Sequence, residues 1–261
     1  MFPLATSLSR PVRHRVVRGA LVILFSCSLL LAGSANAQIP DEFTNLKVLP
    51  RDISRGDLVD VMRGFSLSLG VRCQYCHVGG DGRSFQGVEF DKDDDPHKRQ
   101  ARFMMEMVET LNEKTLAKMP DRSDTPVVMQ CKTCHRGRPK PLLLTQELQL
   151  ALESGGVDST VAHLRSLRKE FDNSGAYDFG EWETNLFAEK LQSEGRSAEA
   201  IAVYELNAEY FPESPSIAFS LGMLYEQQGE TETAMRHYER AMELSPRDKR
   251  AQERLEALQK R

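Results

Sequence analysis

The sequence predicts an all-α protein, and three observations support this fold class. Runs of valine, isoleucine, threonine and aromatic residues with two-residue alternation, which are typical of strands, are scarce. Apolar residues instead recur at spacings of three and four, which places them on one face of a helix. The last third of the chain also repeats a pattern every 34 residues, a period typical of paired helices. A chain of 261 residues can hold two small domains.

Residues 1–37 have the features of a secretory signal peptide. Four arginines and no acidic residue precede an apolar run from Ala20 to Ala32, and the small residues 35–37 (Ala-Asn-Ala) follow. This order predicts cleavage before Gln38 and export to the periplasm. The run is short for a membrane span, so we expect no stable span after cleavage, and an uncleaved anchor is the alternative. Cys27 lies inside the run and is expected to be removed with the peptide.

A first helix is predicted to begin after Ser54 and to end at Gly70. Ser54 followed by Asp57 resembles a capping box, and glycine commonly ends a helix. Apolar residues spaced by four, three and four share one face of this helix. They are Leu58, Met62, Phe65 and Leu69.

The pattern Cys-x-x-Cys-His occurs twice, in residues 73–77 and 131–135. Each copy predicts covalent attachment of a c-type haem, in which two cysteines form thioethers and the histidine binds iron from one side. The sequence therefore predicts two haem c groups. The attachment residues are Cys73, Cys76, Cys131 and Cys134, and the proximal ligands are His77 and His135.

Two other interpretations of the cysteine pairs fit less well. A thioredoxin-like redox pair would need a βαβ context, which is not visible in this sequence. A four-cysteine zinc site usually has its pairs about 15–20 residues apart. Here 54 residues separate Cys76 from Cys131. Neither interpretation explains why a histidine follows both pairs.

A second helix is predicted to begin at Asp95-Pro96, where aspartate caps the helix and proline takes its first position. Glycines between residues 79 and 82 predict a turn before it, and the acidic residues 91–95 predict a solvated loop. The helix is expected to reach about Lys114. Its predicted core stripe consists of Ala101, Met104, Val108 and Leu111, flanked by Phe103 and Met107.

Met62 stands eleven residues before Cys73, on the helix with the apolar face. A thioether on a helix packed against a porphyrin can supply the second axial ligand, so Met62 is a candidate distal ligand of the first iron. The alternative is that Met62 fills core, as most helical methionines do.

The two motifs and the helices before them resemble the cytochrome c subunit of photosynthetic reaction centres. The similar segments are Met62–Phe65, Leu69–His77, Lys98–Arg102, Met107–Asn112 and Cys131–Gly137. They are similar to the last two haem segments of that tetrahaem family, over about residues 45–145. The resemblance implies that Met62, on the helix ahead of the first motif, is the sixth ligand of the first iron.

The chain departs from the family in having two haem motifs instead of four. In the family the last haem takes a distal histidine from the N-terminal half, which has no counterpart here. Met107 matches a part of the family pattern that packs near the haem, and we expect it to be the distal ligand of the second iron. The alternatives are an open iron position and the side chains of His97, His163, Met104, Met105 and Met119.

The 34-residue repeat is that of tetratricopeptide (TPR) proteins. Glycine, alanine, tyrosine and proline recur in register, as Gly195, Ala200, Tyr204 and Pro212 and then as Gly229, Ala234, Tyr238 and Pro246. The copies are predicted over residues 181–214 and 215–247, followed by a capping helix over 248–260. A further amphipathic helix is predicted over residues 157–171.

These patterns divide the chain near residue 145. We expect a dihaem cytochrome domain over residues 41–145, a helical linker over 146–180 and the repeats over 181–261. Without the four arginines of the signal peptide, the chain has 30 basic and 38 acidic residues, a formal charge of −8. This charge argues against nucleic acid as a partner and is compatible with docking to a basic redox protein.

The function that these features predict is single-electron transfer between redox proteins in the periplasm, with no substrate and no catalytic residue. The repeat would dock a protein partner on its concave surface, and any contact with a membrane would be through a partner. Two alternatives belong to other classes. One is a peroxidase-like haem enzyme at an open second iron, and the other is a redox-sensing scaffold.

Overall fold

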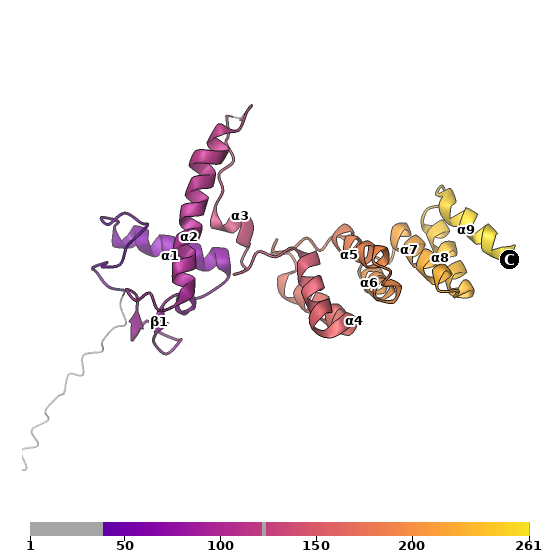
Figure 1. The fold of residues 1–261 in the computed structure, drawn as a ribbon, viewed down its shortest axis with the longest axis horizontal. Helices are drawn as coiled ribbons and strands as arrows, with labels where there is room; N and C mark the ends of the chain where they lie inside the picture. Colours follow the sequence, from indigo (N-terminus) through magenta and orange to yellow (C-terminus); the bar gives the residue numbers. More distant parts are fainter. Residues whose placement is uncertain (1–38, 122–123, 261) are drawn as a thin grey trace, which may run out of the picture. The chain divides into compact units, whose positions relative to one another are not determined.

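The computed structural model describes residues 39–121 and 124–260. The predicted signal peptide, Cys27 and the cleavage position before Gln38 therefore lie outside the described residues. Nine α-helices and a single pair of two-residue strands form the regular structure of the described ranges, so the all-α prediction is confirmed (Figure 1). Within these ranges, no helix is both long and apolar enough to cross a membrane.

The first helix, α1, spans Arg55–Leu69 and has the predicted ends. The Ser54 hydroxyl accepts a hydrogen bond from the main-chain N–H of Asp57, at 3.1 Å. Gly70 ends the helix in the left-handed conformation, with φ of 67°, and its N–H bonds to the carbonyl of Ser66. Local side-chain chemistry thus determines where α1 begins and ends.

The first haem motif follows α1 as a short 3₁₀ turn, Cys73–Tyr75 (η1). The predicted glycine turn then lies inside a small hairpin, in which β1 (Val78–Gly79) pairs antiparallel with β2 (Val88–Glu89). The carboxylate of Asp81 accepts hydrogen bonds from the main-chain N–H groups of Arg83 and Ser84, which fixes the loop.

The second helix, α2, spans Pro96–Thr110, and the Asp95 side chain caps it as predicted. A π-helical turn, Leu111–Thr115 (η2), and a 3₁₀ turn, Leu116–Lys118 (η3), continue it. The Asn112 side chain bonds to both the N–H and the carbonyl of Met129, and so holds the segment before the second motif. That motif forms α3, Cys131–His135.

The predicted core stripe of α2 is wrong, because no side chain of this helix is fully buried. One stripe residue, Ala101, lines a cavity that α1 also lines, and Lys98, Arg102 and Met105 of α2 line it too. A helix that borders a cavity keeps a partly polar face.

Helix α4, Leu144–Phe171, is longer than predicted. Gly156, with φ of 73° and ψ of −166°, divides it into two helical halves, and only the second half was expected. Leu144, Leu148 and Leu152 of the first half are buried in the same hydrophobic cluster as the helices that follow. Their spacing of four is a helical signal, but the sequence analysis predicted an amphipathic helix only from residue 157 onwards.

The repeat region consists of two helix pairs and a final helix, as predicted (Figure 1). The elements are α5 (Glu181–Ser193), α6 (Ser197–Tyr210), α7 (Pro215–Gln227), α8 (Thr231–Leu244) and α9 (Lys249–Gln259). The repeat tyrosines Tyr204 and Tyr238 are buried. A Cβ atom added to Gly222 would stand 2.7 Å from the Tyr238 ring, so the small residue lets α7 and α8 approach.

Candidate functional site

A cavity of about 490 Å³ lies beside the first motif, and Cys73, Cys76 and His77 all line it. The predicted apolar face of α1 forms one wall, through Leu58, Met62, Phe65 and Leu69. Pockets of about 300–1,000 Å³ with mainly apolar walls are typical of cofactor sites. The residues of the first motif thus share one cavity with the predicted distal ligand.

Two methionines line this cavity, one from each helix. Met62 comes from α1, as the sequence predicts, and Met105 comes from α2. Both side chains are partly buried. The cavity therefore contains two candidate distal ligands for an iron bound by His77, both of them thioethers. The sequence pattern had indicated only Met62.

His77 has surroundings that favour a neutral imidazole. Burial lowers its pKa, and the nearby cation Lys98 lowers it further. The ring lies 5.0 Å from the ring of Phe90, measured between centroids. Its Nδ1 atom is buried near the carbonyl of Phe90, but it has no hydrogen-bond partner of good geometry among the described residues. A neutral imidazole has a free nitrogen lone pair, which is the form that binds a metal.

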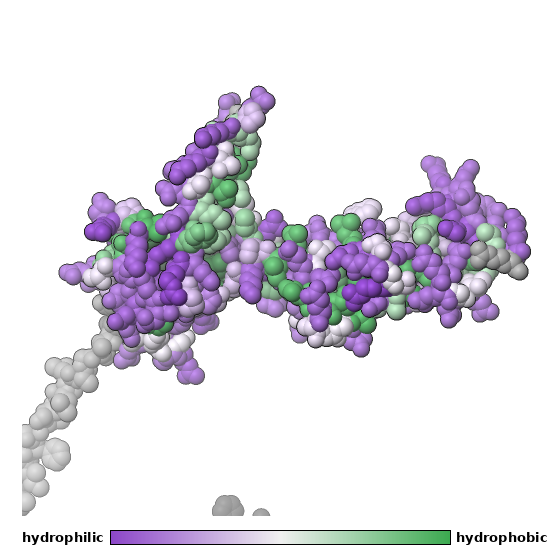
Figure 2. Space-filling view, viewed as in Figure 1, coloured by the Kyte–Doolittle hydropathy of each residue, from purple (hydrophilic) through white to green (hydrophobic). Residues whose placement is uncertain are grey.

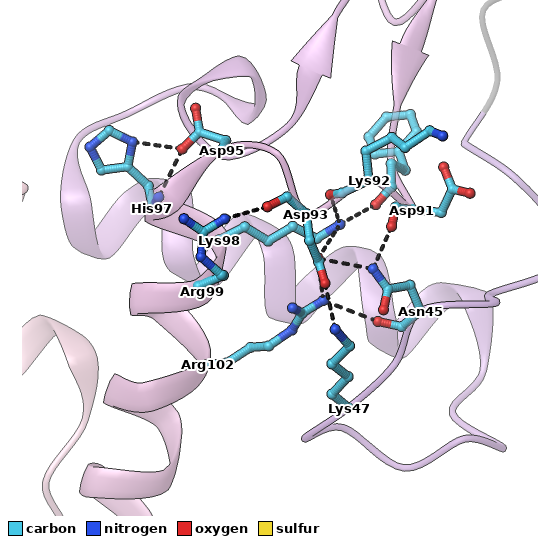
Figure 3. A network of polar contacts seen from close by, with 11 residues as sticks. Asn45, Lys47, Asp91, Lys92, Asp93, Asp95, His97, Lys98, Arg99 and Arg102 are labelled. Carbon is cyan, nitrogen blue, oxygen red and sulfur yellow. Dashed lines mark hydrogen bonds and ion pairs between the residues drawn. The ribbon is translucent and has the colours of Figure 1, made fainter.

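The polar edge of the cavity is organised around Asp93 (Figure 3). Its carboxylate pairs with Arg102 at 2.9 Å and with Lys98 at 3.6 Å, and it also contacts Lys47. Hydrogen bonds from Arg102 and then Lys47 hold the pKa of Asp93 well below its usual range. Asn45 joins this network through its side-chain amide. Residues before α1 and at the start of α2 are thus held together beside the cavity.

The segment before α1 is a part of the site that the sequence analysis did not identify. Its apolar side chains cover the cavity, namely Ile39, Phe43, Leu46, Val48 and Leu49. They have no regular secondary structure and hence no periodic pattern. Lys98 and Arg102 were also missed, although their spacing of four with Ala101 between them already put them on one helix face.

The second motif has a different environment. His135 is buried, Cys131 is partly buried and Cys134 is exposed. The Nδ1 atom of His135 lies 2.8 Å from the main-chain carbonyl of Arg138. Because a carbonyl can only accept, Nδ1 carries the hydrogen and Nε2 keeps the lone pair. This is the arrangement expected of a histidine that binds metal through Nε2.

The end of α1 contacts the second motif. The main-chain N–H of Gly137 donates to the carbonyl of Ser68 at 2.8 Å. Gly70 lies so close that a Cβ atom there would stand 2.1 Å from the carbonyl oxygen of Gly137. One helix therefore lines the cavity of the first motif and packs against the second.

Apolar side chains are exposed in the region of α2 and α3 (Figure 2). Val127 and Val128 lie just before α3, and Phe103 of α2 is 67% exposed. Met107 is on α2, partly buried, and does not line the first cavity. It is two residues from Met105, and thus about 200° around the helix, on the side of Phe103.

The two histidine candidates have polar partners, and Met119 is exposed. His97 lies with Nδ1 2.8 Å from Asp95, and its ring is 4.0 Å from the ring of Tyr75 in the first motif. His163 contacts Glu147 of the same helix at 3.4 Å. Met119 is exposed beyond the end of η3. In the parts of the chain that the structure describes, no group of three or more His, Cys, Asp or Glu side chains is suited to a metal ion.

Comparisons with known proteins agree with both halves of the sequence prediction. Residues 56–151 match the family model of the photosynthetic reaction centre cytochrome C subunit, and residues 215–258 match that of a tetratricopeptide repeat. No curated protein matches the chain. The first match includes both Cys-x-x-Cys-His motifs, the helices α1 and α2 that line the cavity and the contact between α1 and α3, whereas the cavity-lining residues before α1 lie outside it. The chain thus joins a region similar to the reaction-centre cytochrome subunit to a region similar to a tetratricopeptide repeat.

Proposed function

We propose that this chain is an exported dihaem cytochrome that transfers single electrons between protein partners. The observation that carries this proposal is the cavity that Cys73, Cys76 and His77 line together with Met62. A cavity of about 490 Å³ with a mainly apolar wall fits a porphyrin, and the lining cysteines and histidine are the donors that c-type haem requires. Bound haem would supply the reversible one-electron chemistry of its iron.

The roles of the residues follow from this proposal. Cys73 and Cys76 would hold the first haem, with His77 as the proximal ligand and Met62 as the distal ligand. Lys98 and Arg102 line the same cavity with little exposure and would pair with the haem carboxylates. The apolar segment before α1 would exclude water, which favours retention of the haem.

For the second haem, Cys131 and Cys134 would form the thioethers and His135 would bind the iron. The support is the hydrogen bond from Nδ1 of His135 to Arg138, which leaves Nε2 free to bind a metal. Haem at this motif would cover apolar surface that includes Val127 and Val128, which is otherwise costly to expose. We propose Met107 as the distal ligand.

The repeats would dock a protein partner. Helices of such repeats present a concave surface, and α5 carries Trp182 and Leu186, one turn apart and both exposed. Export through residues 1–37 would place the protein in the periplasm, where c-type haem is attached to exported chains in bacteria.

Mass spectrometry of the protein from the periplasmic fraction tests this function. We expect a chain that begins at Gln38 and carries the mass of two haems. Replacing Cys73 and Cys76 with alanine should remove one haem, and replacing Cys131 and Cys134 should remove the other. Bound zinc without haem would disprove the proposal. Cyanide or carbon monoxide binding without a change of ligand would instead support the enzyme alternative, because only an open iron binds them readily.

A further inference from the structure

Arg138 contacts the second haem motif through its main chain and the helical module through its side chain. Its carbonyl accepts the hydrogen bond from Nδ1 of His135. Its side chain is 8% exposed, and Nη2 donates to the carbonyl of Ala176 at 3.0 Å. Ala176 lies in the loop between α4 and α5, and so outside the residues that match the cytochrome family.

The guanidinium of Arg138 lies over the face of the Tyr177 ring. The ring centroid of Tyr177 lies 3.8 Å from the central carbon of the Arg138 guanidinium. Arginine keeps its charge when buried, so it needs compensating partners, and an aromatic face is one of them. Tyr177 is itself buried and packs edge-on against Phe171 at the end of α4. The position of Arg138 thus depends on how α4 and the following loop are packed.

Glu147 of α4 completes the cluster. Its Oε1 atom accepts a hydrogen bond from the Tyr177 hydroxyl at 2.8 Å and lies 3.8 Å from Nη1 of Arg138. Its Oε2 atom is 3.4 Å from Nε2 of His163. Burial, followed by the hydrogen bond to Glu147, raises the pKa of Tyr177 to about 12.

The first motif has no equivalent of this cluster. Nδ1 of His77 is buried without a hydrogen-bond partner of good geometry among the described residues. A partner at this nitrogen fixes the orientation of a metal-binding imidazole and increases its basicity. Among the described residues, His135 is thus linked through Arg138 to α4 and the loop after it, whereas His77 has the nearby carbonyl of Phe90 without a hydrogen bond of good geometry.

We propose that Arg138 is a positioning residue, through which Tyr177 and Glu147 orient His135 and set the reduction potential of the second haem. This inference rests on the proposed attachment of haem at the second motif. Its consequence is that a change in the packing of α4, including one caused by a partner on the repeats, would alter one haem potential and leave the other unchanged.

Spectroelectrochemical titration of the dihaem protein tests the inference. We expect Arg138→Gln and Tyr177→Leu to shift one midpoint potential and to leave the other at the wild-type value. Tyr177→Phe keeps the ring over the guanidinium but removes the bond to Glu147, so its shift should be smaller. The control is Arg165→Gln, which removes an exposed ion pair of α4 with Glu209 and should move neither potential.

Nuclear magnetic resonance supplies a second readout, because the paramagnetically shifted haem methyl signals report the orientation of the axial histidine. One haem's signals should change in Tyr177→Phe, which is the variant to use if Arg138→Gln does not fold. Two bound haems with unchanged potentials and unchanged methyl signals would overturn the inference, and so would equal shifts of both potentials. A wild-type protein without haem on Cys131 and Cys134 would instead overturn the proposed function, and mass spectrometry detects this before any variant is made.

Discussion

Gly70 and Gly137 approach so closely that no side chain fits between them. A Cβ atom on Gly70 would stand 2.1 Å from the carbonyl oxygen of Gly137 and 2.9 Å from its carbonyl carbon. Gly70 ends α1, and Gly137 lies two residues after His135, the last residue of the second motif. The pair therefore determines how closely α1 and the second motif can pack.

Gly70→Ala should destabilise the protein by more than the strain of its backbone alone. A residue with a side chain at a left-handed position costs about 1–3 kcal/mol, and here the collision with the main chain of Gly137 is added. Gly82→Ala is the matched control, because Gly82 also has a positive φ but no atom within 4 Å of the added Cβ. Thermal unfolding should give a lower midpoint for Gly70→Ala than for Gly82→Ala. Equal midpoints would show that the close approach contributes nothing.

Met62 and Met105 line the same cavity, and a pair of variants shows which of the two binds the first iron. Leucine retains most of the volume of methionine but cannot bind iron, so Met62→Leu should remove one of the two near-infrared signals that arise from charge transfer between sulfur and iron. Met105→Leu should keep both signals. Met62→His should lower one midpoint potential, because methionine raises the potential relative to histidine. Loss of one signal in Met105→Leu and of none in Met62→Leu would make Met105 the ligand.

Much of the fold could be predicted because its signals are local. Ser54 and Gly70 mark the ends of α1, Asp95 caps α2, and the 34-residue period gives the helix pairs of the repeat. The first half of α4 also had a local signal, in leucines four residues apart. The predicted helix over residues 157–171 did not use this signal, although the linker over 146–180 was expected to be helical.

Other parts of the site could not be predicted from the sequence because they arise from tertiary contacts. The residues before α1 cover the cavity without a repeating pattern, and their role depends on where the chain folds back. Arg138 lies 38 residues from Ala176 and 39 from Tyr177, and no spacing rule connects them. Periodicity gives the helices, whereas the packing between them brings these partners together.

The repeat should lose stability in alkaline solution, with Tyr225 as one cause. Burial raises the pKa of Tyr225 to about 12, with a further contribution from its hydrogen bond to Glu205. The unfolded value is about 10, so the folded protein retains a proton that the unfolded chain loses between these limits. The stabilisation is complete below about pH 10 and is lost as the pH rises towards about 12. Denaturant unfolding at several pH values should show a shallower fall for Tyr225→Phe than for the wild type. Identical slopes would contradict this assignment.

Identifying the distal ligand of the second iron is the most demanding test of the proposed site. Met107 and Met105 lie on opposite sides of α2. Because Met105 lines the first cavity, Met107 points away from it. Exposed Phe103 is one turn before Met107 on that side, where the surface is apolar. Near-infrared magnetic circular dichroism should therefore show histidine–methionine ligation at both irons, and Met107→Leu should remove one of the two signals. A bis-histidine signal would instead indicate His97 or His163. His163→Gln then separates these two, because His163 pairs with Glu147 of α4 whereas His97 lies against Tyr75 of the first motif.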